Sequence, residues 1–89
     1  MFRTLRFISG EEATPDHNSK ILYMEGKDAP KFGMFTLVWG KHSDSVWDLI
    51  DYQEEDPGSE YGLIGLIDGK MVHDEIYWMS VEQFEEVVR

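Results

Sequence analysis

The dipeptide Asp68-Gly69 constrains the fold more than any other feature of this sequence, because it fixes how two segments pair. It follows the apolar run 61–67 and precedes a second strand-like stretch, which runs from about Lys70 to Trp78. A type I′ turn needs positive φ at both central residues, and Asp-Gly is among the pairs that adopt this conformation most readily. The dipeptide therefore predicts a β-hairpin, and with it antiparallel pairing, in the second half of the chain.

Three further strands are predicted in the first half of the chain. Strand-forming residues indicate segments 2–8 and 20–25, separated by a turn-rich loop over residues 9–19. The third segment, 32–39, carries apolar residues on both of its faces. A strand of this kind is typical of the centre of a sheet, so we expect it to be covered on both sides.

A first helix is predicted from Ser43 or Asp44, where the spacing of apolar residues changes from two to 3.6. It places Val46 and Leu49 on one face and ends before the helix-breaking pair at 57–58.

A second helix is predicted from Ser80, which forms a capping box with Gln83, while Met79 and Phe84 occupy the positions of a hydrophobic staple. The resulting order is βββαββα. The sequence thus predicts an α+β fold, a mainly antiparallel sheet of about five strands with two helices packed on it. We expect a single compact domain over residues 1–89.

The chain contains no cysteine, so its 89 residues must be held together by packing rather than by disulfides or thiolate metal sites. No apolar run approaches the ~20 residues that span a bilayer. These features favour a cytoplasmic protein with no membrane contact, and they give no indication of a cofactor.

The negative charge is concentrated in the second half of the chain. Of the 18 acidic residues, 13 lie in segment 43–89, where Lys70 and Arg89 are the basic residues and the net charge is −11. A surface of this sign repels nucleic acid and anionic membranes, and it attracts basic proteins or cations. We therefore expect no direct contact with nucleic acid.

On the predicted first helix, Asp44, Asp48, Asp51 and Glu55 form one stripe, because their spacing of three or four residues returns them to the same face. No lysine relieves the repulsion between them. The residues expected to extend this acidic surface are Glu54, Asp56 and Glu60, together with Glu82, Glu85 and Glu86 on the last helix.

We interpret this surface as the docking site of a non-enzymatic binding protein for a basic surface on another protein, most simply an inhibitor of a nucleic-acid-binding or nuclease-like partner. Nucleic-acid mimicry would need both predicted helices on one side, since one stripe repeats every ~4.5–6 Å whereas duplex DNA carries a charge every ~1.7 Å. The alternatives for the stripe are an ordinary solvated face and a cation site.

Two other functions stay open. His42, Asp44, His73 and Glu75 could form a metal site or the centre of a small cation-dependent enzyme, although neighbouring histidines and acids arise easily in so acidic a sequence. We assign no catalytic residue and no metal ligand.

Exposed aromatic residues offer the second alternative, an immunity-type protein or accessory subunit. Tyr52 and Tyr61 border the acidic segment and would anchor such a contact, whereas Trp39 and Trp47 are expected in the core. The sequence leaves the oligomeric state open.

Overall fold

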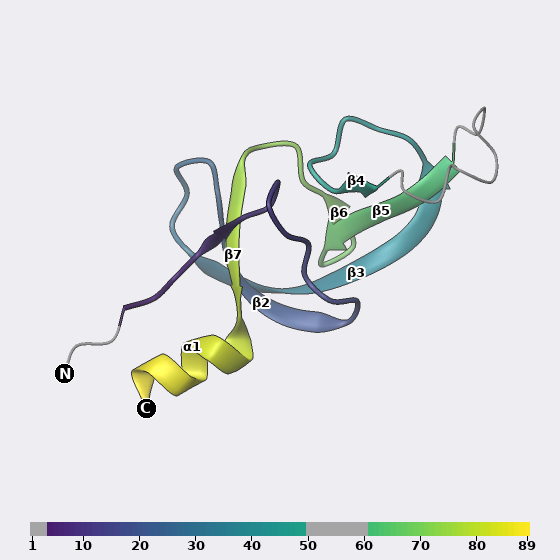
Figure 1. Cartoon of the computed structure of the whole chain (residues 1–89). Coiled ribbons are helices and arrows are strands. Elements are labelled where there is room, and N and C mark those ends of the chain that lie inside the picture. The colour runs from purple at the N-terminus through teal and green to yellow at the C-terminus, as the bar shows by residue number, and fades with distance from the viewer. Residues whose placement is uncertain (1–3, 50–60) are drawn as a thin grey trace.

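The computed structural model describes residues 4–49 and 61–89, which form a curled antiparallel sheet with one short helix at its end (Figure 1). The strands lie in the order β1-β7-β2-β3-β5-β4, and β6 pairs with β5 outside this path. The elements are β1 (Ile8–Ser9), β2 (Ser19–Glu25), β3 (Lys31–Lys41), β4 (Asp48–Leu49), β5 (Tyr61–Ile67), β6 (Lys70–Met71), β7 (Ile76–Ser80) and α1 (Val81–Val88).

The predicted hairpin is confirmed. β5 has the predicted bounds, and Asp68 and Gly69 have φ values of 51° and 79°, as a type I′ turn requires. The return strand β6 ends at Met71 and is therefore shorter than predicted. The next residue, Val72, leaves the pairing with β5, and its carbonyl accepts a hydrogen bond from Val46 N at 2.7 Å. The chain then crosses over the central strand β3 and pairs with β2 as β7.

β3 is the central strand of the sheet, as predicted, and its length explains why the sheet curls. Its first half pairs with β2 and its second half with β5, so the two neighbours continue in different directions (Figure 1). Phe35 lies where the two pairings meet, opposite Ser19 on one side and Ile67 on the other. The core gathers on the inner face around Phe35 and consists of Ile21, Tyr23, Phe35, Trp47, Ile67, Val72 and Ile76.

The prediction that β3 is covered on both faces was wrong. On the outer face, Phe32 and Val38 are 58% and 39% exposed. The reason is the size of the one helix, since α1 has eight residues and lies against β2 and β7.

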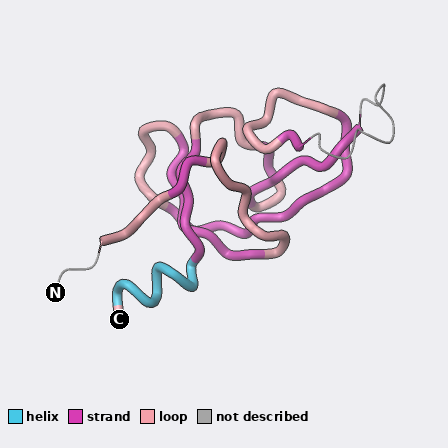
Figure 2. Tube along the Cα trace, viewed as in Figure 1, coloured by secondary structure: helices cyan, strands magenta, loops and turns pink. Residues whose placement is uncertain are grey.

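The predicted fold class was also wrong, because the described start of the predicted first helix is not helical. Val46 and Trp47 form a turn, and Asp48–Leu49 form β4, which pairs with Ile64 and Leu63 of β5. Figure 2 shows helix only at the C-terminal end of the described chain. The rest of this prediction falls on residues 50–56, outside the described residues.

Tertiary packing overrides the helical spacing at this point. Trp47 is buried to 1% exposure, its carbonyl accepts from Gly65 N at 2.7 Å, and its indole Nε1 donates to the Gly10 carbonyl at 3.1 Å. These contacts hold the turn at Val46 and Trp47 against β5, and the chain continues from it as β4.

The first predicted strand is reduced to Ile8–Ser9, and residues 4–7 are not part of a strand. β1 pairs with β7, in the register Ile8 to Trp78 and Ser9 to Tyr77. β7 ends at Ser80, where the chain turns into α1. The residues that precede Ile8 therefore have little strand beside them to pair with.

The last helix begins as predicted. The Ser80 hydroxyl accepts a hydrogen bond from Gln83 N at 3.1 Å and caps α1. Phe84 makes an edge-to-face contact with Phe32 on β3, with ring centroids 5.6 Å apart. No residue of α1 is fully buried. The cap therefore stabilises a helix that buries little apolar surface.

Replacing Gly65 by alanine should destabilise the protein, because a Cβ atom there would lie 2.7 Å from both Phe35 Cε2 and Trp47 Cβ. Overpacking of this kind costs about 1–3 kcal/mol, measurable by urea unfolding. Gly40→Ala is the control, since its Cβ would meet just the flexible tip of Ile64 at 3.2 Å. Equal stability of the two variants would contradict the packing described for Trp47.

Ser80→Ala should weaken α1 by about 1 kcal/mol, because Gln83 N loses its acceptor. The helical signal in far-UV circular dichroism should fall, while the unfolding midpoint of the sheet changes little. Ser80→Asp keeps an acceptor at this position and should retain the helix. Cooperative loss of the whole fold in Ser80→Ala would show that α1 is more tightly integrated than its exposure indicates.

Candidate functional site

The predicted acidic stripe is not formed in the described residues. Asp44 is 96% exposed, but Asp48 is 13% exposed and is held by its own loop. One Asp48 oxygen lies 2.6 Å from His42 Nδ1, and the other accepts from Ser43 N at 2.7 Å. Asp48 therefore fixes the 42–48 loop instead of extending to a partner. The predicted site residues Asp51, Tyr52, Glu54, Glu55, Asp56 and Glu60 lie outside the described residues.

The four residues of the predicted metal site are not brought together. His42 pairs with Asp48, and His73 Nδ1 lies 3.5 Å from Asp44 Oδ1. Glu75 instead accepts a hydrogen bond from the Tyr77 hydroxyl. Across residues 4–49 and 61–89, no three histidine or carboxylate side chains lie close enough together to hold a metal ion.

A different acidic cluster forms around Tyr77, and we call it the Tyr77 acidic patch: Glu11, Glu12, Glu75 and Tyr77. The pairing of Ser9 with Tyr77 creates it, because the turn after Ser9 carries Glu11 and Glu12 to that point. Glu12 N donates to the Ser9 carbonyl at 3.0 Å, and Glu11 N donates to the Ser9 hydroxyl at 3.3 Å. Two segments more than 60 positions apart thus supply one surface.

The carboxylates of this cluster raise the pKa of Tyr77. Its pKa is raised above the ordinary tyrosine value, first by the hydrogen bond to Glu75 and the charge of that carboxylate, then by desolvation and the charges of Glu11 and Glu12. A nearby negative charge disfavours the tyrosinate anion. The patch is therefore a region of negative potential.

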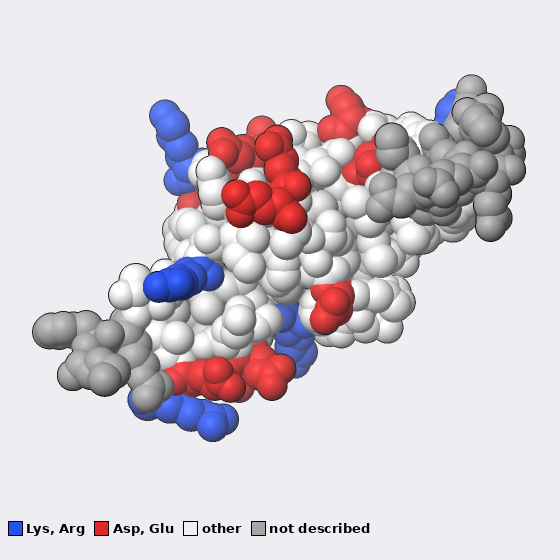
Figure 3. Space-filling model, in the orientation of Figure 1, with Lys and Arg blue, Asp and Glu red and all other residues white. Residues whose placement is uncertain are grey.

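Figure 3 shows carboxylates over the loops at the upper end of β7 and, below, on α1. The predicted residues Glu82, Glu85 and Glu86 belong to α1 and are exposed. Both ion pairs between described side chains join an aspartate to a histidine. Neither of these two ion pairs includes a lysine or an arginine.

Three of the four aromatic residues singled out in the sequence, Trp39, Trp47 and Tyr61, lie within the described residues. Tyr61 is 50% exposed, at the end of β5. Trp39 is 61% exposed, so its predicted core position was wrong, whereas that of Trp47 is confirmed. Trp39 and Tyr61 lie diagonally across the β3–β5 pair, near the end of β3 where neither β2 nor α1 covers the sheet.

Comparison of this chain with models of protein families, with curated proteins and with solved structures gives no match. Among the described residues, no helix is long and apolar enough to cross a membrane.

Tyr77 should titrate above an ordinary tyrosine, and Glu75→Gln should lower its pKa because a neutral amide replaces the charged acceptor that contributes most to the shift. A raised pKa in the folded state means that the neutral phenol is favoured by folding. The associated stability is present below the unfolded pKa of about 10 and is lost as pH rises through the folded pKa. Ultraviolet titration, with Tyr77→Phe to assign the signal, measures the shift. An unchanged pKa in Glu75→Gln would contradict the patch.

Proposed function

We propose that this protein is a binding module that docks the Tyr77 acidic patch onto a basic surface of another protein. The observation that carries the proposal is the convergence of Glu11, Glu12 and Glu75 on one tyrosine whose pKa they raise. Carboxylates that are not neutralised within a protein attract a positively charged partner and accelerate the encounter.

The backbone beneath the patch supports this proposal, because it is held on both sides. Gly10 N donates to the Ile76 carbonyl at 2.9 Å, and Gly26 N donates to the Glu75 carbonyl at 2.7 Å. Tyr77 itself lies within β7, between β1 and β2. A surface fixed before binding loses less conformational entropy when a partner docks.

Tyrosine at the centre of the patch also suits a protein interface. Its ring supplies apolar contact area, and tyrosine is enriched among residues that dominate binding energies. A rim of acids around such a ring would select a partner with lysine or arginine around an apolar or aromatic contact.

The basic surface that we favour is one that otherwise binds nucleic acid, as in a nuclease, which the protein would inhibit by occupying it. Strict nucleic-acid mimicry is a weaker form of this proposal, because its charge spacing depended on a helix that does not form over residues 44–49. The partner would be met in the cytoplasm, the compartment favoured by a cysteine-free sequence.

Replacing Glu11, Glu12 and Glu75 together by glutamine should weaken binding to a partner recovered from cells of the source organism by at least tenfold, because three favourable charges are lost. Binding of the wild-type protein should also weaken steeply with added salt. The affinities can be measured by biolayer interferometry, with circular dichroism to verify folding.

The matched control removes three charges elsewhere, with Asp16→Asn, Glu82→Gln and Glu86→Gln. It should bind nearly as well as the wild type if the Tyr77 acidic patch is the contact surface. Equal losses in both triple variants would indicate a general effect of net charge, and binding indifferent to salt would exclude the proposal.

A further inference from the structure

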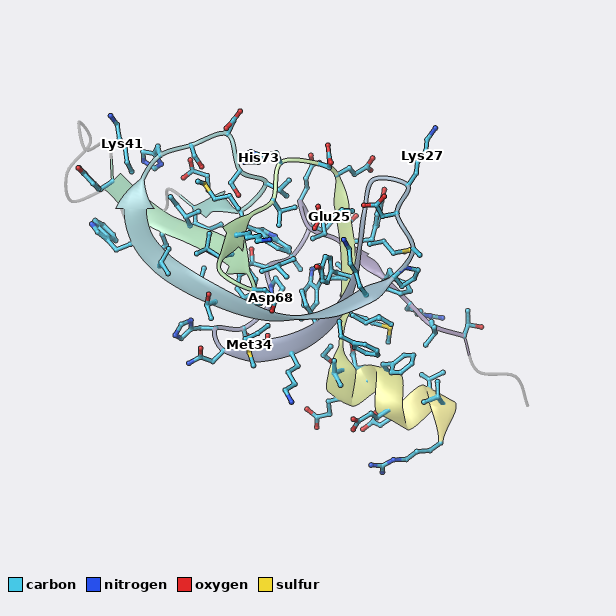
Figure 4. The ribbon with its side chains drawn as sticks, turned by 180° about the vertical axis from the view of Figure 1, so that it is seen from behind. Glu25, Lys27, Met34, Lys41, Asp68 and His73 are labelled. Carbon is cyan, nitrogen blue, oxygen red and sulfur yellow. The ribbon has the colours of Figure 1, made fainter. Side chains whose placement is uncertain are left out.

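A groove runs between α1 and the strands β2 and β3, on the outer face of the sheet. It has a volume of about 390 Å³ and is lined by Lys20, Phe32, Gly33, Met34, Asp68 and Val81. Figure 4, which views the molecule from behind, shows Met34 and Asp68 close together at β3, with α1 below them. The groove is distinct from the Tyr77 acidic patch, with which it shares no residue.

Helix α1 covers only part of the apolar surface beside the groove. Phe32 and Val88 are each 58% exposed, and Phe84 is half-buried against Phe32. Val81, Phe84 and Val88 share one side of the helix, because they are spaced by three and four residues. A continuous apolar surface of this kind on a small protein typically marks an interface.

Charges of both signs border this surface. Lys20 lies opposite Met34 in the β2–β3 register, and the Asp68 carboxylate is anchored by a hydrogen bond from Met34 N at 2.9 Å. Glu85 follows Val81 by one helical turn and so lies on the same side of α1. The ion pairs between described side chains join His42 to Asp48 and His73 to Asp44, so Lys20 is paired with neither Asp68 nor Glu85.

We propose that this surface binds a second copy of the chain. A two-fold axis brings the same surface of both copies together, so that each contact between two residues occurs twice, once in each direction. Here the Phe32–Phe84 surface of one copy would pack on its counterpart, and Lys20 of each copy would lie against the Glu85 side of the other. An apolar surface with unpaired charges of both signs at its border is complementary to itself.

The net charge of −10 opposes association of two copies, and α1 carries Glu82, Glu85 and Glu86 beside the groove, so the dimer must rest on the apolar contact and on the pairing of Lys20 with Glu85. Val81 follows Tyr77 by four residues, which is ~13 Å along an extended strand, whereas charges are screened over ~8 Å at physiological ionic strength. The dimer therefore leaves both Tyr77 acidic patches exposed and would present two of them in one particle. This inference does not depend on the proposed function.

Sedimentation velocity over a concentration series tests the proposal. The wild-type protein should shift from monomer to dimer, and Phe32→Ser should weaken association at least tenfold. Val38→Ser is the control, because Val38 is also exposed on β3 but does not line the groove. A wild-type protein that stays monomeric up to its solubility limit would overturn the proposal.

A charge exchange separates this contact from a general loss of apolar surface. Lys20→Glu should weaken the dimer because like charges then face each other, and Glu85→Lys added to it should restore association. Failure of the double variant to recover, with folding verified by circular dichroism, would overturn the proposed pairing. The glutamine variant of Glu11, Glu12 and Glu75 should remain dimeric, so each proposal can fail without the other.

Discussion

The burial of Trp47 is the contact on which the rest of this structure depends. Its indole meets the Phe35 ring edge-to-face, with centroids 5.0 Å apart, and Gly65 leaves the space that it needs on β5. Its Nε1 also binds the Gly10 carbonyl after β1. One side chain thus joins the first loop, the central strand and the hairpin strand, which are distant in sequence. The curl of the sheet around Phe35 encloses this contact.

The same contact decides where the acidic residues can act. Because Trp47 places its segment alongside β5, Asp48 faces His42 and Ser43 and stabilises the loop that contains them. The carboxylates that converge are instead those delivered by the pairing of β1 with β7. The Gly10 carbonyl accepts a hydrogen bond from the Trp47 indole, and Gly10 N donates to the Ile76 carbonyl on β7. The burial of Trp47 therefore also positions the turn that carries Glu11 and Glu12. Core packing and surface charge are therefore linked through a single loop.

Local signals in the sequence predicted local structure well. The Asp68-Gly69 turn, the bounds of β5 and the Ser80 cap are each specified by a few adjacent residues, and the structure confirms all three. The helix predicted from Asp44 was wrong, because apolar residues spaced as on a helix also suit a turn whose tryptophan is drawn into the core. The Tyr77 acidic patch could not be predicted. Its two segments meet through a pairing of just two residues in β1, which leaves no periodic signal.

β7 connects the two surfaces that we propose as interfaces, since the Tyr77 acidic patch lies near its first residues and α1 begins at its last. The central part of this strand is held on both sides, by β1 and by β2, so the surfaces keep a fixed relation to each other. The carboxylates of the Tyr77 acidic patch lie at one end of β7, and the apolar surface beside the groove lies at the other. A small chain without disulfides can present two such surfaces because its core lies on the inner face, which leaves the outer face and the loops available for contacts.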